Sequence, residues 1–227
     1  MILNPLILLS AQAYVFVAIF KVQMENYSLY LVSGLLPWMF FSQTLEMTSS
    51  AYVNQGSLLR AFNLKPMTIT LSQVIDNALN SLIAIFLVFS IHFIIFHKSL
   101  EFELSILSRF TLGFIPWILT VITVSFIVGV LHVSYRDTKF VASFFLQVGF
   151  YLTPILYPSN YVPTQMAWLL KLNPIYVLIR PMQVRSENLP TLIWLEEYLL
   201  AWGLFIVIAL ISWVIWKKEQ NNFYAKI

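Results

Sequence analysis

Residues 150–181 read FYLTPILYPSNYVPTQMAWLLKLNPIYVLIRP, and this stretch poses the main structural problem of the chain. It is apolar enough to enter a membrane, yet a proline interrupts it every few residues. Each proline removes a backbone N–H donor and clashes with the preceding helical turn. At membrane depth, such broken backbone is tolerated only where protein or a water-filled cavity covers it. The segment is therefore expected to fold against protein, beside a polar pathway.

The stretch contains two short helical runs, Met166–Leu172 and Tyr176–Ile179. Each is too short to span a bilayer, which takes about 20 helical residues. A residue before a proline is biased away from helix, so the break is expected at Asn173–Pro174. The pattern predicts a re-entrant hairpin over about residues 158–181, and the alternative is an amphipathic loop on the membrane surface. The residues expected to shape the hairpin are Pro154, Pro158, Asn173 and Pro174.

The composition indicates a membrane protein. Of the 227 residues, 59% are hydrophobic and 10% are charged. Soluble domains have about 25% charged residues, and a core of this size cannot hide so much apolar surface. The solvent of this chain must therefore be partly lipid.

Charge and cysteine content exclude several classes of function. The net charge is only +3 and the longest basic run is the pair Lys217–Lys218, so no nucleic-acid partner is expected. Basic residues beside apolar spans are more simply topology signals. The chain has no cysteine, which excludes disulfides, cysteine–zinc sites and thiol catalysis.

Apolar runs of spanning length recur along the chain, and they lack the alternation of barrel strands. The six predicted spans cover about residues 4–20, 29–47, 71–96, 110–133, 140–157 and 198–216. The predicted fold is therefore an all-α polytopic membrane protein with six transmembrane helices. The re-entrant hairpin lies on the outer side between the fifth and sixth helices, and residues 1–227 form a single transmembrane domain.

Basic residues set the expected orientation, because they concentrate in cytoplasmic loops. On the other side, the short loops keep only Lys21, Lys98 and Arg109. Both termini are therefore expected in the cytoplasm. The loops assigned to the cytoplasm contain Arg60, Lys65, Arg136, Lys139, Lys217, Lys218 and Lys226.

The connection between the second and third spans, residues 49–70, is too elaborate for a simple loop. It predicts a short amphipathic helix around Gly56–Asn63 that ends before Lys65–Pro66. This helix would lie on the cytoplasmic side.

Polar residues inside the third span form the first candidate site. Four of them recur at i, i+3, i+4 and i+7, which places them on one face of a helix. An ionised Asp at mid-bilayer costs about 2.5–3.5 kcal/mol on insertion scales, so such residues face a cavity or a partner. A transport pathway and plain interhelical hydrogen bonding both fit the pattern. The residues are Gln73, Asp76, Asn77 and Asn80.

Aromatic residues form the second candidate site. Trp38 and Phe41 lie in the middle of a span, and Tyr151, Tyr157 and Trp168 surround the predicted hairpin. Aromatic faces suit the apolar faces of sugar rings, but large aromatics also fill membrane bundles. Both a substrate channel and core packing stay open.

Catalytic motifs are absent from the sequence. It has no H-E-x-x-H zinc pair and no G-x-x-x-x-G-K-[ST] phosphate loop, so no metal site or enzymatic activity is expected of this chain. Any ATP would have to be bound by another chain. A competing hypothesis is a multispan transferase acting on lipid-linked sugars, with Asp76, Asp137 or His132 as its base.

Three stretches resemble one family. They are G-L-L-P-W-M-F-F-S at residues 34–42, Y-R-D at 135–137, and Y-L-T-P-I-L-Y-P at 151–158 with L-N-P at 172–174. Together they resemble the permease subunits of type-2 ABC exporters, and within these the branch that exports O-antigen, capsule and teichoic-acid polysaccharides. Members usually carry an amphipathic interface helix before the first span, whereas here that span starts at Asn4–Pro5.

The resemblance implies a homodimer in the bacterial inner membrane, joined to two copies of a separate ATPase that binds ATP and Mg²⁺. It implies a coupling helix at about residues 54–66, with Asn54, Arg60, Lys65 and Pro66 as contacts of the ATPase. The implied substrate is a polysaccharide on a polyprenyl-pyrophosphate lipid. Exporters of drugs or other lipids share the fold and are the alternative.

Overall fold

The computed structural model describes residues 27–96, 100–184 and 190–226, and the regular structure in these ranges is entirely helical. The predicted first span, about residues 4–20, lies outside the described residues. The helices are α2 (Tyr27–Asn54), α3 (Gly56–Ala61), α4 (Pro66–Phe96), α5 (Leu100–Ser134), α6 (Thr138–Leu152), α7 (Ala167–Leu172), α8 (Pro174–Ile179) and α9 (Thr191–Lys226). Short 3-10 turns lie at Ser159–Tyr161 (η2), Thr164–Met166 (η3) and Arg180–Met182 (η4).

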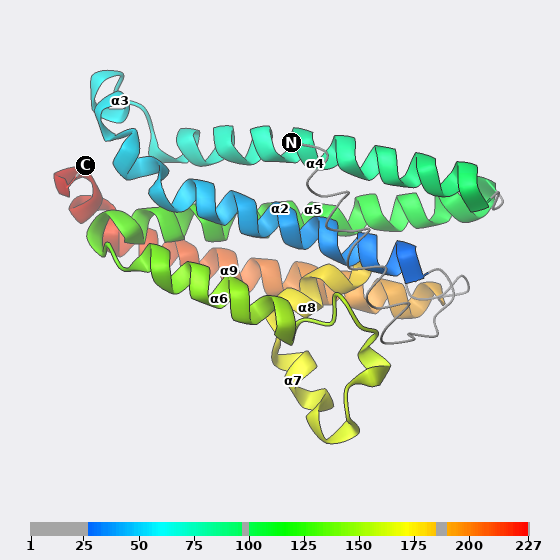
Figure 1. The fold of residues 1–227 in the computed structure, drawn as a ribbon. Helices are drawn as coiled ribbons and strands as arrows, with labels where there is room; N and C mark the ends of the chain where they lie inside the picture. The colour runs from blue at the N-terminus through cyan, green and yellow to red at the C-terminus, as the bar shows by residue number, and fades with distance from the viewer. Residues whose placement is uncertain (1–26, 97–99, 185–189, 227) are drawn as a thin grey trace.

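The long helices lie side by side as one bundle (Figure 1). Helix α5 packs most extensively against α2 and α9, while α4 and α6 pack against α2. Helix α3 and the C-terminal end of α9 lie at the same end of the bundle, and α7 projects from its side (Figure 1).

The described helices fit a membrane protein. Three of them contain stretches that are long and apolar enough to cross a bilayer, at Pro66–Leu87, Leu104–Ser134 and Thr191–Lys226. Helix α6 is apolar but has only 15 residues. The predicted helical membrane fold is confirmed, whereas the count of six spans and the side of the termini stay predictions.

The predicted fifth span, residues 140–157, is shorter than expected because α6 ends at Leu152. The backbone N–H of Thr153 still donates to the carbonyl of Gly149 at 3.0 Å. The next residue, Pro154, has no N–H with which to continue the helical ladder. The chain therefore leaves the helix at the first proline of the broken stretch.

The main core surrounds α2. Leu29, Leu35 and Phe40 of this helix are almost fully buried, as is Trp117 of α5. The indole N–H of Trp117 donates to the carbonyl of Pro37 at 3.2 Å. Large side chains thus fill the centre of the bundle.

A second, smaller core lies at the α3 end. Its centre is Tyr52, whose fully buried ring meets the edges of Phe126 and Phe223. The Tyr52 hydroxyl forms a hydrogen bond with the hydroxyl of Thr70 on α4. Leu59 of α3 belongs to the same cluster. The second core therefore ties α3 to α2, α4, α5 and α9.

Candidate functional site

The broken segment after α6 is held by tyrosines of α2. The hydroxyl of Tyr27 donates to the carbonyl of Leu156 at 2.6 Å. The hydroxyl of Tyr30 lies 2.6 Å from the carbonyl oxygen of Pro154 and 2.8 Å from that of Tyr157. Buried carbonyls without a partner are costly. The side chains of α2 thus replace the donors that a continuous helix would have supplied.

A second set of bonds fixes the far end of this segment to the same place. The side-chain amide of Gln183 donates to the carbonyl of Pro154 at 2.8 Å. The backbone N–H of Val184 donates to the hydroxyl of Ser33 at 2.9 Å. All of these groups are buried. The two ends of the broken stretch, around residues 154 and 184, therefore meet on α2.

Removing one hydroxyl tests this arrangement. The variant Tyr30→Phe is expected to destabilise the protein by about 1–3 kcal/mol, because the Tyr157 carbonyl loses this donor and the buried Pro154 carbonyl keeps only that of Gln183. The measurement is thermal unfolding of the purified protein in mild detergent. Tyr161→Phe is the control, since Tyr161 is exposed and its hydroxyl makes no hydrogen bond to the described residues. Equal melting temperatures for both variants would contradict this role of Tyr30.

The predicted break at Asn173–Pro174 is present and separates α7 from α8. The Asn173 side-chain oxygen accepts from the backbone N–H groups of Ile175 at 3.0 Å and Tyr176 at 3.2 Å. Its amide donates to the hydroxyl of Thr153 at 2.9 Å. Pro174 occupies the first turn of α8, where no N–H is needed. Asn173 therefore caps α8 and joins it to the end of α6.

An ion pair joins α8 to the last helix. The guanidinium of Arg180 donates to the carboxylate of Glu197 at 2.7 Å and to the hydroxyl of Ser159 at 3.3 Å. The same guanidinium lies 4.9 Å from the centre of the Tyr176 ring. The pair thus connects η2, the end of α8 and α9 at one point.

The aromatic residues predicted to line a channel fall into two groups. Trp38 and Phe41 are buried in the main core, where Trp38 packs on Phe150 and Phe41 packs on Trp117. These contacts fit the packing alternative. In contrast, Tyr151 is 70% exposed and Trp168 is 57% exposed. Tyr157 is partly buried, and its hydroxyl donates to the Tyr151 carbonyl at 3.0 Å.

The predicted polar face of α4 is also divided. The amide of Asn77 is buried and donates to the Thr44 hydroxyl at 2.7 Å and to the Phe40 carbonyl at 3.1 Å. Asp76 is exposed, and the Asn80 amide donates back to its carbonyl at 3.0 Å. Gln73 is partly exposed. Asn77 therefore joins α4 to α2, whereas Asp76 faces outward.

The predicted short helix in the connection is present as α3. Leu59 is buried in the second core, while Leu58 and Phe62 are exposed, Phe62 by 68%. Asn63 then adopts a left-handed conformation with φ of 49°, which asparagine tolerates better than most residues. The chain thus turns back from α3 while presenting two apolar side chains at the surface.

Of the four predicted contact residues of this region, Asn54, Arg60 and Lys65 are exposed. Pro66 is buried as the first residue of α4, a position at which proline is favoured. Contacts of all four residues with an ATPase stay a prediction. Leu58 and Phe62, which the sequence did not single out, are exposed in the same region.

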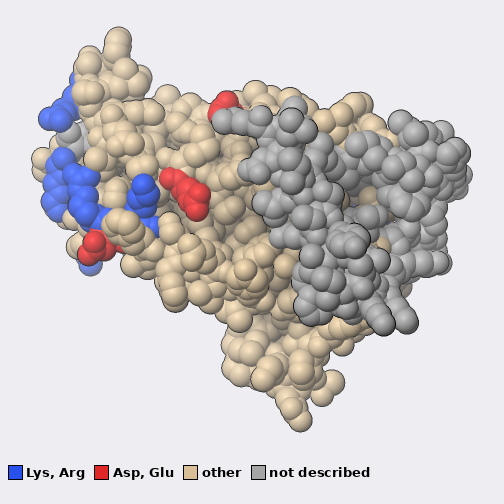
Figure 2. All heavy atoms as spheres, viewed as in Figure 1, with Lys and Arg blue, Asp and Glu red and all other residues tan. Residues whose placement is uncertain are grey.

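Basic side chains gather at the end of the bundle that bears α3 and the C-terminal end of α9 (Figure 2). The exposed basic residues of α3, of the turn that follows it and of the C-terminal end of α9 are Arg60, Lys65, Lys217, Lys218 and Lys226. Among the described residues, no group of three or more His, Asp or Glu side chains lies close enough to hold a metal ion.

Sequence comparisons place this architecture among known proteins. The sequence pattern of the family described as ABC-2 type transporter matches residues 1–184. Two O-antigen export system permease proteins RfbA of Klebsiella pneumoniae are 26% and 27% identical over 178 residues, covering 78% of this chain and 68% and 67% of the relatives.

A third relative, the O-antigen export system permease protein RfbA of Myxococcus xanthus, is 24% identical over 193 residues. The match covers 80% of this chain and 69% of that protein. The family pattern extends from the start of the chain to the end of the broken segment at residue 184. This helical, multi-pass membrane protein therefore belongs to the ABC-2 type transporter family.

Proposed function

We propose that this chain is the membrane-spanning subunit of an ATP-driven exporter that moves a lipid-linked polysaccharide across the bacterial inner membrane. The observation that carries the substrate class is that all three relatives described above are named as O-antigen export permeases. An exporter of drugs or other lipids is the second candidate, because it would share the family. A transferase has no support from the family match.

In this proposal a separate ATPase docks at α3 and supplies the energy, and this chain binds neither ATP nor Mg²⁺. The support is structural. Helix α3 presents exposed Leu58 and Phe62 beside Arg60, a mixture of apolar and basic groups that suits a protein partner. Its buried Leu59 rests on the second core, which reaches α2, α4, α5 and α9. A displacement of α3 by the ATPase would thus be transmitted through the second core to α2, α4, α5 and α9.

The proposal includes a homodimer. A hydrated glycan needs a wide polar passage, and the centre of this bundle is filled by Phe40, Trp117 and their neighbours. A passage between two copies of the chain avoids this obstacle. The exposed aromatic side chains of α6, at Phe144, Phe145 and Tyr151, are available for such a surface.

In this proposal both termini lie in the cytoplasm, and the segment of about residues 158–181 is the outer re-entrant hairpin beside the exit. The support is the gathering of Lys and Arg at the end that bears α3 (Figure 2), because basic residues favour the cytoplasmic side. The buried Tyr176 and Leu178 of α8 are consistent with a helix inserted among the others.

Deleting the gene tests the substrate class. Cells without the protein are expected to accumulate lipid-linked glycan on the cytoplasmic side, because synthesis continues while export stops. The measurement is mass spectrometry of extracted lipid-linked glycans, with a strain that expresses the full chain from a plasmid as the control. Wild-type glycan levels together with increased drug sensitivity would instead support the drug exporter.

A further inference from the structure

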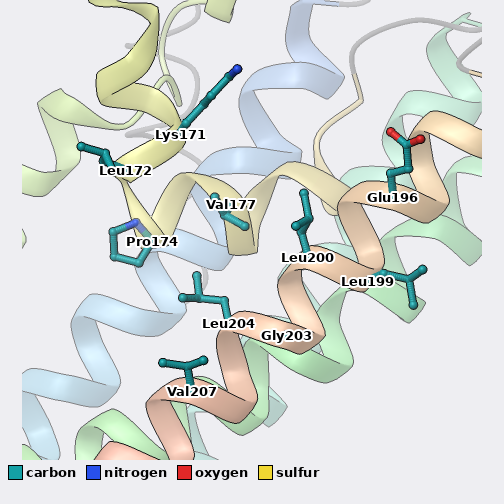
Figure 3. Close-up of a pocket in the computed structure, with 10 residues that line it drawn as sticks. All are labelled: Lys171, Leu172, Pro174, Val177, Glu196, Leu199, Leu200, Gly203, Leu204 and Val207. Atoms are coloured by element: carbon teal, nitrogen blue, oxygen red, sulfur yellow. The ribbon is translucent and has the colours of Figure 1, made fainter.

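A surface groove of about 770 Å³ runs between α7, α8 and the first half of α9 (Figure 3). This volume falls within the range of about 300–1,000 Å³ that is typical of small-molecule sites. The groove is built almost entirely from apolar side chains and one glycine. Its lining consists of Lys171, Leu172, Pro174, Val177, Glu196, Leu199, Leu200, Gly203, Leu204 and Val207.

The groove has one positive and one negative charge, and both lie at its rim. Lys171 at the end of α7 and Glu196 on α9 extend toward the same side, away from the apolar floor (Figure 3). Both are exposed, and neither has an ion-pair partner among the residues that the structure describes. The neighbouring Glu197 is instead paired with Arg180. A long apolar trough thus ends at two separate charges of opposite sign.

We propose that this groove binds a zwitterionic phospholipid with a phosphoethanolamine headgroup. One acyl chain lies along Leu200, Gly203 and Val207, the phosphate pairs with Lys171, and the primary ammonium donates to Glu196. The acyl chain gains close packing contacts with the side chains of the trough, and charge-assisted hydrogen bonds fix the headgroup. The assignment is independent of the exported substrate and of the ATPase.

Charge complementarity favours this lipid over others. An anionic headgroup or a pyrophosphate would gain Lys171 but would be repelled by Glu196. A quaternary ammonium has no N–H to donate to the Glu196 carboxylate, so a choline headgroup makes the weaker contact. A headgroup with one phosphate and one N–H-bearing cation offers a partner of opposite charge to each rim residue.

The bound lipid would also position α7. This helix packs mainly on α8 and on η3, and its Trp168 and Leu172 are exposed. An acyl chain between α7 and α9 would fill the space that the protein leaves open there. The lipid would thus brace the outer part of the broken segment against the last helix.

A substitution at Gly203 can be used to block the groove. A Cβ atom added at this position meets no atom within 4 Å, and Gly203 lines the trough, so the variant Gly203→Phe is expected to place its ring in the trough. The matched control is Val214→Phe, which adds an aromatic ring at a position of the same helix that is 60% exposed and lies outside the groove. The rim is tested with Lys171→Gln and Glu196→Gln.

The experiment is native mass spectrometry of the full, delipidated chain, titrated with phosphatidylethanolamine, phosphatidylglycerol and phosphatidylcholine of identical acyl chains. Wild type and Val214→Phe are expected to bind phosphatidylethanolamine most tightly. Gly203→Phe is expected to bind it about tenfold more weakly, a loss of about 1.4 kcal/mol, because the ring occupies the place of the acyl chain. Glu196→Gln should lose the preference over phosphatidylglycerol, and Lys171→Gln should weaken binding of both lipids.

Two outcomes would overturn the proposal. The first is undiminished phosphatidylethanolamine binding by Gly203→Phe, which would place the lipid elsewhere. The second is a wild-type protein that binds the three lipids equally, because the rim charges would then have no role. If, in the first of these outcomes, Gly203→Phe also changed the ratio of monomer to dimer, the groove would be a contact between copies of the chain.

Discussion

Reversing two charges beside α3, with Arg60→Glu and Lys65→Glu, is expected to abolish export and to reduce the amount of co-purified ATPase by tenfold or more. Both side chains are exposed, next to the apolar Leu58 and Phe62. Reversal of an interfacial charge places like charges together, which costs several kcal/mol, and each 1.4 kcal/mol is about tenfold in affinity. The measurement is affinity purification of the tagged chain from native membranes, followed by quantification of bound ATPase.

The matched control carries the same charge change at the same end of the molecule. In Lys218→Glu with Lys226→Glu, two exposed residues of α9 are reversed, and Lys217 next to the apolar span is kept. This variant is expected to retain the ATPase. Comparable loss of ATPase in both double variants would mean that overall charge, and not α3, determines docking. Normal association and export in the Arg60 and Lys65 variant would remove α3 as the docking element.

The proline pattern predicted the broken segment but not what covers it. The break at Asn173 and the two short helices follow from local rules for proline and asparagine, so the sequence was sufficient. The partners of the freed carbonyls lie more than a hundred residues away, on α2. A signal existed in the three-residue spacing of Tyr27, Tyr30 and Ser33, which places three hydroxyl groups on one face of an apolar helix.

For the residues predicted to line a channel, the sequence alone was not sufficient. Trp38 and Asn77 were chosen for their unusual position in a span, but an aromatic or an amide there can face a core, a pathway or lipid. The neighbouring helix has to be known as well: Trp38 packs on Phe150 of α6, and Asn77 donates to Thr44 of α2, while a channel role for either residue stays a prediction. Periodicity within one helix carries no information on which helix lies beside it.

Adding a single methyl group at Gly129 is expected to weaken the second core and, with it, the anchor of α3. A Cβ atom at this position would lie 2.6 Å and 2.8 Å from two ring carbons of Tyr52 and 3.1 Å from the carbonyl oxygen of Thr48. The ring has no room to move, because it is fully buried against Phe126 and Phe223. Overpacking of this kind costs about 1–3 kcal/mol.

The same substitution at Gly203 is expected to stabilise the protein slightly, whereas Gly129→Ala destabilises it. No atom lies within 4 Å of a Cβ there, so Gly203→Ala keeps only the gain in helix propensity, up to about 1 kcal/mol. The two alanine variants are compared by thermal unfolding in the same detergent, and by the amount of ATPase that each retains. Gly129→Ala should melt at a lower temperature than the wild type and bind less ATPase, whereas Gly203→Ala should do neither. If Gly129→Ala melted with the wild type, the second core would be too soft to transmit a displacement of α3 to the long helices.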